Sequence, residues 1–167
     1  MGAWRKFEEL VKPWMLVVVF VLLLLFGFYK EANAEVSVEL GATFLSGEFS
    51  DGGGLLLSET FDDKWRIGMG FTSEQVVTDR SNDTYHVRNN LFVHGQRLVP
   101  ITRNLDFGIG VGYFNATTRW NGSHFVASLS MEYSLNDKWS LNYRHWSNAG
   151  SASPNMGQDL FSVGYKF

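Results

Sequence analysis

The 167-residue chain contains no cysteine, which excludes disulfides, thiol nucleophiles and a cysteine-linked lipid anchor. It has only three prolines, and two of them, Pro100 and Pro154, lie beyond residue 34. The formal net charge is -3 and no long run has one sign, so no nucleic-acid partner is expected. Beyond residue 34 the sequence also lacks an apolar run of 18 residues, which excludes a membrane-spanning helix there.

An apolar run does occur near the N-terminus, from Trp14 to Tyr29, after several cations and before the small-residue motif Ala32-Asn33-Ala34. This order of charged, apolar and small-residue parts is that of a secretory signal peptide. We therefore predict that residues 1–34 are a signal peptide, cleaved after Ala34, and that residues 35–167 form the mature protein. The alternative is a retained membrane anchor, since a span needs roughly 17–25 residues and this run is near the lower limit.

Apolar and polar residues alternate repeatedly in the rest of the chain. In residues 123–135 the odd positions from Phe125 to Leu135 are apolar or small, and the even positions are mostly polar. Residues Phe161 to Phe167 alternate in the same way. A period of two predicts strands with two different faces. The predicted strands are 36–49, 54–61, 65–75, 84–99, 105–114, 123–135, 139–147 and 159–167.

The connections between these strands are alternately short and long. The short turns are 62–64, 100–104 and 136–138, and the longer segments are 50–53, 77–83, 118–122 and 148–158. Short turns at one end, longer loops at the other and an even number of strands are typical of outer-membrane barrels. We therefore predict an all-β protein, an eight-stranded antiparallel up-and-down transmembrane β-barrel of the bacterial outer membrane.

A soluble lipocalin-like barrel or a β-sandwich would show the same alternation. Glycines on the polar faces, and aromatic residues such as Trp65, Trp139 and Phe167 at strand ends, favour the membrane barrel. An eight-stranded barrel is just wide enough for side chains to fill, so its inward charges are expected to be paired. The residues predicted to face inward include Glu39, Arg66, Arg88, Asp106, Glu132, Arg144 and Lys166, together with His86, His94 and His124, whose spacing does not suggest zinc.

The predicted strand 139–147 breaks its own pattern at the far end. Counting from Trp139, His145 and Ser147 fall on the lipid-facing side and Trp146 falls inside, the reverse of what solvation favours. Counting back from Phe167 places Asp159 on the same face of the neighbouring strand, at a similar height. Each polar residue alone would be tolerated at the rim of the membrane. Three together, where apolar side chains are expected, indicate a functional site.

An acid, a base and a hydroxyl on one face fit a serine hydrolase. Ser147 would attack an ester carbonyl while His145 removes its proton, and Asp159 would orient the imidazole. Asn148 and Asn155, or backbone N–H groups beside them, are candidates to stabilise the oxyanion.

Residues 144–150, with the sequence Arg-His-Trp-Ser-Asn-Ala-Gly, are followed by Pro154-Asn155 and by an acid before the last strand. This segment resembles the C-terminal signature of the lipid A 3-O-deacylase (PagL) family. The resemblance implies an outer-membrane barrel that hydrolyses the ester-linked acyl chain at the 3 position of lipid A, with a Ser-His-acid triad on its outer wall. It implies Ser147 as nucleophile and His145 as base, and it favours Asn155 over Asn148 for the oxyanion site. Family members often have Glu where this chain has Asp159, need no metal or organic cofactor, and in some cases form homodimers.

The sequence thus predicts a lipid A deacylase whose substrate is lipopolysaccharide and whose active site faces the outer leaflet. Two other interpretations remain open. A structural or adhesin-type barrel would use the 145–159 cluster only to stabilise a hairpin. An outer-membrane acyltransferase would move the acyl chain to an acceptor other than water.

Overall fold

The computed structural model describes residues 34–45, 48–78, 84–116, 122–150 and 157–167. No helix within these ranges is long and apolar enough to cross a membrane. The strands of the described part are β1 (Glu35–Leu45), β2 (Glu48–Phe61), β3 (Trp65–Thr72), β4 (Gln75–Thr78), β5 (Thr84–Val87), β6 (Asn90–Thr102), β7 (Leu105–Phe114), β8 (Phe125–Ser134), β9 (Trp139–Ser147) and β10 (Gln158–Lys166).

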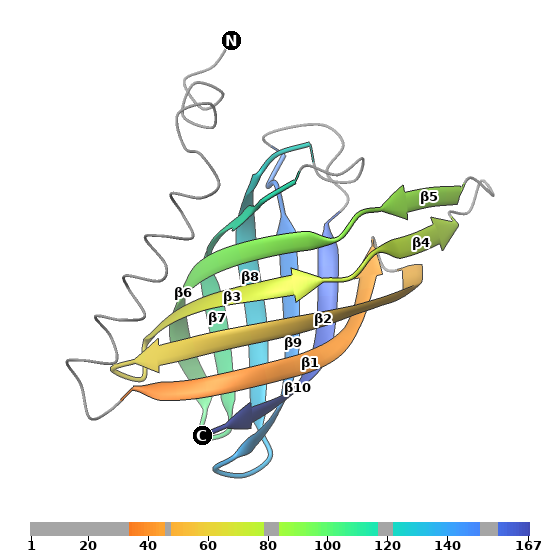
Figure 1. Cartoon of the computed structure of the whole chain (residues 1–167). Coiled ribbons are helices and arrows are strands. Elements are labelled where there is room, and N and C mark those ends of the chain that lie inside the picture. The colour runs from red at the N-terminus through yellow and green to blue at the C-terminus, as the bar shows by residue number, and fades with distance from the viewer. Residues whose placement is uncertain (1–33, 46–47, 79–83, 117–121, 151–156) are drawn as a thin grey trace. The chain divides into compact units, whose positions relative to one another are not determined.

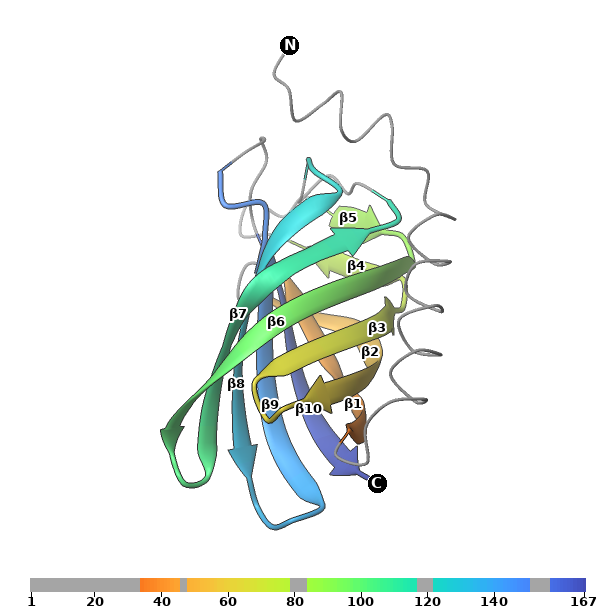
Figure 2. The same ribbon diagram turned by 90° about the vertical axis from the view of Figure 1, so that its left-hand side faces the viewer.

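Eight of these strands close into a barrel in the order β1-β10-β9-β8-β7-β6-β3-β2, and β2 pairs back onto β1. Figures 1 and 2 show the barrel from two directions at right angles. All neighbouring strands are antiparallel, and the first and last strands form the closing seam, where Val38 pairs with Tyr165. The prediction of an eight-stranded up-and-down barrel is therefore confirmed.

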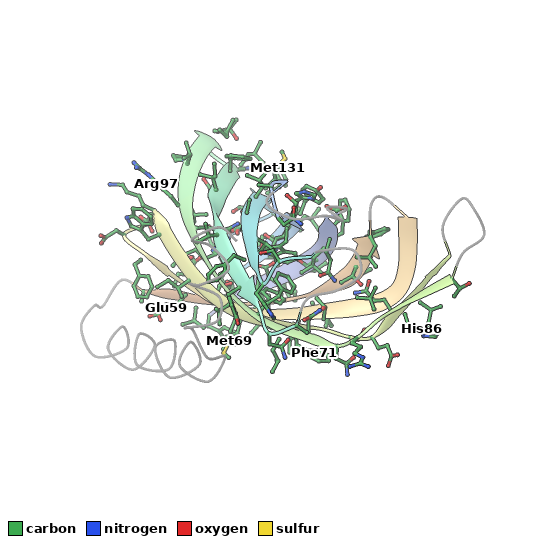
Figure 3. The ribbon with its side chains drawn as sticks, turned by 90° about the horizontal axis from the view of Figure 1, so that it is seen from above. Glu59, Met69, Phe71, His86, Arg97 and Met131 are labelled. Carbon is green, nitrogen blue, oxygen red and sulfur yellow. The ribbon has the colours of Figure 1, made fainter. Side chains whose placement is uncertain are left out.

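The remaining strands, β4 and β5, form a two-stranded ladder of their own. They continue the β3–β6 hairpin beyond the wall of the barrel (Figure 1). The prediction of one strand over 84–99 was wrong, because the chain leaves one ladder at Val87 and enters the barrel only at Asn90. His86 and Arg88 are consequently exposed instead of facing inward, and Figure 3 shows His86 on this extension.

Two further predictions about the strands are corrected. The segment 50–53, expected to be a loop, lies inside β2, and the predicted strand 36–49 divides between β1 and β2. At this hairpin Phe44 pairs with Phe49 and Leu45 with Glu48. The alternation of apolar and polar residues continues from one strand into the other, so the sequence pattern does not show where β1 ends and β2 begins. His124 precedes β8, where its Nδ1 lies 2.8 Å from the carbonyl oxygen of Phe114, whereas His94 is buried in the interior as predicted.

The interior of the barrel holds two paired charge clusters. In the first, the guanidinium of Arg144 binds the carboxylate of Glu39 with both Nε and Nη2, and Nη1 donates to Oε1 of Gln96 at 3.0 Å. In the second, Arg66 lies 2.6 Å and Lys166 3.0 Å from the carboxylate of Glu132. These pairs satisfy the requirement that buried charges be compensated, as the sequence predicted.

An apolar cluster occupies another part of the interior. It contains Trp146, which is only 1% exposed, and its ring centroid lies 4.9 Å from that of Phe92. This cluster explains why a tryptophan at an inward position of β9 is stable there. The other members are Leu56, Phe114, Val126 and Leu160.

The outer wall is apolar. Large side chains on alternate positions point away from the interior, as Figure 3 shows for Phe71 and Met131. Trp65, Trp139 and Phe167 are exposed near the ends of the strands, at the end of the barrel with the short turns. An apolar wall with aromatic residues at its border is the outer surface of a membrane barrel.

Candidate active site

The predicted cluster lies on the outward faces of β9 and β10. In β9, Arg144 and Trp146 are buried, whereas His145 and Ser147 are partly exposed. In β10, Gln158 and Leu160 are buried and Asp159 is partly exposed. Since successive side chains of a strand point to opposite faces, the three predicted catalytic residues lie on the outer wall of the barrel.

The pairing of β9 with β10 brings two of these residues into contact. Asp159 lies directly opposite His145 in the ladder, and its Oδ1 is 2.7 Å from Nδ1 of His145. Side chains directly opposite each other in an antiparallel pair have Cβ atoms roughly 4.5–5.5 Å apart, which suits a short acid and an imidazole. Asp159 therefore holds Nδ1 of His145, and among the described residues no hydrogen bond to Nε2 is found.

The ring of His145 extends along the strands toward the level of Ser147. A Cβ atom added at Gly157 would lie 2.6 Å from Cε1 and 3.3 Å from Nε2 of His145. Because Asp159 pairs with His145 and Gln158 with Trp146, the next step of this register would place Gly157 opposite Ser147. Among the described contacts, none joins the hydroxyl of Ser147 to the imidazole. The structure thus directs Nε2 toward the level of Ser147 and places the hydroxyl on the same face.

The chain turns sharply after Ser147. Ala149 and Gly150 both have positive φ, at 50° and 78°, and Oδ1 of the buried Asn148 accepts a hydrogen bond of 3.0 Å from the N–H of Gly150. Asn148 therefore shapes the turn directly beside Ser147. The other predicted oxyanion residue, Asn155, lies outside the described residues.

An apolar groove of about 700 Å³ begins at Asp159 on the outer wall. Its lining includes Tyr143 and Phe161, whose ring centroids are 4.8 Å apart, and it reaches Leu105 on β7. The other lining residues are Phe44, Met131, Tyr133, Leu141 and Asn142. A groove of this composition, open to the membrane side, suits an acyl chain.

Tyr143 and Gly157 were not singled out from the sequence. Tyr143 counted only as one more lipid-facing aromatic residue, but its hydroxyl donates to Oδ1 of Asp159 at 2.8 Å. Its position two residues before His145 places it on the same face, but only the register between β9 and β10 brings its hydroxyl to Asp159. Gly157 gave no local signal, because only the register between β9 and β10 places it beside the imidazole. The described residues contain no group of three or more His, Cys, Asp or Glu that could hold a metal ion.

Comparison with known proteins assigns the chain to a family. The profile of a family described as lipid A 3-O-deacylase (PagL) matches residues 51–167. The chain belongs to the PagL family. The matched region contains all of β3 to β10, and therefore both members of the His145–Asp159 pair.

Solved structures place the PagL family member among outer-membrane barrels. The outer membrane enzyme PagL matches with a TM-score of 0.52 and 22% identity, over 80% of this chain and 98% of that chain. Ail, the attachment invasion locus protein of Yersinia pestis, matches with a TM-score of 0.51 and 12% identity, over 80% of this chain and 99% of that one. No curated protein matches this chain in sequence. The structural likeness shows a fold shared by an enzyme and an attachment protein, so the function has to be argued from the site and the family.

Proposed function

We propose that this PagL family member is a serine-type esterase that removes the 3-hydroxyacyl chain from the 3 position of lipid A. The contact of 2.7 Å between His145 and Asp159 on the lipid-facing wall, beside Ser147, is the observation that carries the proposal. An imidazole paired with a carboxylate has no evident structural use on an apolar surface, where ionisable groups are costly. Family membership supports lipid A as the proposed substrate.

The reaction follows from the two ring nitrogens. Nδ1–H of His145 donates to Asp159, which leaves Nε2 unprotonated and able to accept the hydroxyl proton of Ser147. The Oγ atom then bonds to the ester carbonyl carbon, and the bond from that carbon to the sugar oxygen breaks. His145 returns the proton to the departing sugar oxygen. Water attacks the acyl-enzyme in the same way, releases the 3-hydroxy fatty acid and regenerates Ser147.

The groove that begins at Asp159 would hold an acyl chain of the substrate against the outer wall. In this position the ester carbonyl lies at the upper end of the groove, near the turn that contains Asn148. An N–H donor from Asn148, from Asn155 or from the backbone of this turn would stabilise the oxyanion.

We further propose that the site lies at the outer leaflet. Ser147 and Asp159 are at the end of the barrel opposite the short turns 62–64, 103–104 and 135–138. At roughly 3.3 Å per residue and a tilt of about 40°, the climb from Trp139 to Ser147 is roughly 20 Å, close to the upper edge of the apolar band. Lipid A of the same membrane can reach this height by lateral diffusion.

The test compares Ser147→Ala with the wild-type barrel on purified lipopolysaccharide, with released fatty acid and remaining lipid A measured by mass spectrometry. Ser134→Ala serves as the matched control, because Ser134 is at the end of β8 that is far from Ser147. We expect Ser147→Ala to release no 3-hydroxy fatty acid while keeping heat-modifiable migration on gels. Unchanged release by Ser147→Ala would overturn the serine mechanism. An acylated acceptor in place of free acid would indicate an acyltransferase, and intact lipid A with every variant would indicate a structural barrel.

A last part of the proposal concerns export. We propose that cleavage after Ala34 produces a mature protein that begins at Glu35, which is also the first residue of β1. The intact mass of the protein extracted from outer membranes tests this. The mass of residues 35–167 is the expected result, and the mass of the full chain would indicate a retained anchor.

A further inference from the structure

We infer that Tyr143 is a positioning residue for catalysis, which acts by holding the carboxylate of Asp159 in the orientation that His145 requires. The inference rests on the proposed function, since it assigns Asp159 to the acid position of the triad. It adds a residue that neither touches the ester nor exchanges a proton with it.

The hydrogen bonds at Asp159 carry the inference. One oxygen, Oδ1, receives both the hydroxyl of Tyr143 at 2.8 Å and Nδ1 of His145 at 2.7 Å. Two donors that converge on one oxygen fix the rotation of the carboxylate more tightly than a single donor can. The carboxylate plane in turn determines the direction in which the imidazole ring points.

The ladder explains why Tyr143 is able to reach this oxygen. Asp159 is opposite His145, and the next pair on the same face, two residues further from the loops, is Tyr143 and Phe161. Tyr143 is therefore the diagonal neighbour of Asp159, at a spacing that only long side chains span. Its ring rests against Phe161, and Phe161 makes an edge contact with Phe44 on β1 at 5.2 Å between centroids.

The surroundings explain why a second donor is useful. The side chain of Asp159 is only 14% exposed and faces the apolar groove. A carboxylate in such surroundings needs several hydrogen bonds to remain ionised and in place. His145 offers Asp159 only the N–H of Nδ1, whether or not Nε2 is protonated, so the phenol of Tyr143 supplies the second donor that keeps the acid oriented.

The decisive variant is Tyr143→Phe, which removes one oxygen atom and keeps the ring in the groove. We expect kcat on lipid A to fall on the order of tenfold, as for the loss of a hydrogen bond to a charged group, with KM unchanged. Labelling of Ser147 by a fluorophosphonate should slow by a similar factor. Tyr165→Phe is the matched control and should show neither effect, because Tyr165 pairs with Trp139 at the other end of β10 and does not line the groove.

A double-mutant cycle separates positioning from other roles. If Tyr143 acts through Asp159, Tyr143→Phe should have no further effect on kcat in the Asp159→Ala background. A full tenfold loss in that background would overturn the inference, as would a rise in KM with unchanged kcat, which would indicate substrate binding. Wild-type kcat in Tyr143→Phe would also overturn it, and the proposed function would survive if Ser147→Ala were still inactive. Activity in Ser147→Ala would instead refute the proposed function itself.

Discussion

The two faces of β9 carry polar side chains that differ in how they are hydrogen-bonded. On the inner face, Arg144 is fully buried and uses Nε, Nη1 and Nη2 to bind Glu39 and Gln96. On the outer face, the neighbouring residue His145 is partly exposed, and its hydrogen bond among the described residues is made by Nδ1. All three kinds of guanidinium nitrogen in the inner cluster are bound, whereas the outer cluster would keep one ring nitrogen for the proposed proton transfer. The expected roles of these two polar side chains thus depend less on residue type than on how many of their hydrogen bonds are already made.

This comparison also separates stability from activity along one strand. A side chain that is saturated by partners contributes to folding, and its removal leaves a partner buried without compensation. A side chain on the outer wall with one partner contributes less to folding; when His145 is removed, its partner Asp159 keeps the hydrogen bond from Tyr143. Substitutions at alternate positions of β9 should therefore affect two different measurements.

The largest effect is expected for His145→Gln. Without a base for the hydroxyl of Ser147, fatty-acid release should fall by about 10⁶-fold. The free energy of unfolding in urea, measured on the barrel in lipid vesicles, should fall by about 1 kcal/mol or less, because Asp159 keeps the hydrogen bond from Tyr143. A large loss of stability in this variant would contradict the separation of the two faces.

A large effect on folding is expected for Arg144→Met. The change leaves the carboxylate of Glu39 inside the barrel without its cation; among the described residues, the hydroxyl of Ser162 still donates to it at 2.9 Å. Breaking a buried ion pair in this way costs about 3–5 kcal/mol of unfolding free energy. Adding Glu39→Gln should restore most of that loss, because no uncompensated charge is then buried. Failure of the second change to restore stability would show that the guanidinium acts through packing alone.

The parity of β9 and β10 could be read from the sequence because a period of two is local. Counting from Trp139 and from Phe167 was enough to place His145, Ser147 and Asp159 on one wall, and the structure puts His145 and Asp159 in contact. The hydroxyl of Tyr143 on Asp159 could not be read in this way, because a diagonal contact depends on the exact register between two strands. The prediction that His86 faces the barrel interior was wrong for a related reason. The alternation of apolar and polar residues continues from the barrel into the β4–β5 ladder without a break.

A smaller loss of activity than that of His145→Gln is expected for Gly157→Ala, which fills the space beside the imidazole of His145. The added Cβ would lie 2.6 Å from Cε1 of His145 and would push the ring away from Ser147. A displacement of about 1 Å at a catalytic group can lower activity by about 10²-fold. Fatty-acid release measures this effect.

Backbone strain has to be separated from this contact, because φ at Gly157 is +68°. Gly150→Ala is the matched control, since φ there is +78° and an added Cβ meets no atom within 4 Å. Both variants should lose about 1 kcal/mol of stability. A loss of activity in Gly150→Ala equal to that in Gly157→Ala would attribute the effect to strain instead of to the imidazole.

The smallest effect is expected at the other charge cluster of the interior, with Lys166→Met. Lys166 lies near the end of the barrel and contacts Glu35 at 3.1 Å as well as Glu132. Its removal leaves Glu132 paired with Arg66, so no carboxylate loses its last cation inside the barrel. The loss of unfolding free energy should be about 1 kcal/mol or less, and it should shrink further at high salt. A loss as large as that of Arg144→Met would mean that the number of remaining partners does not determine the cost, and the contrast between saturated and unsaturated clusters would then fail.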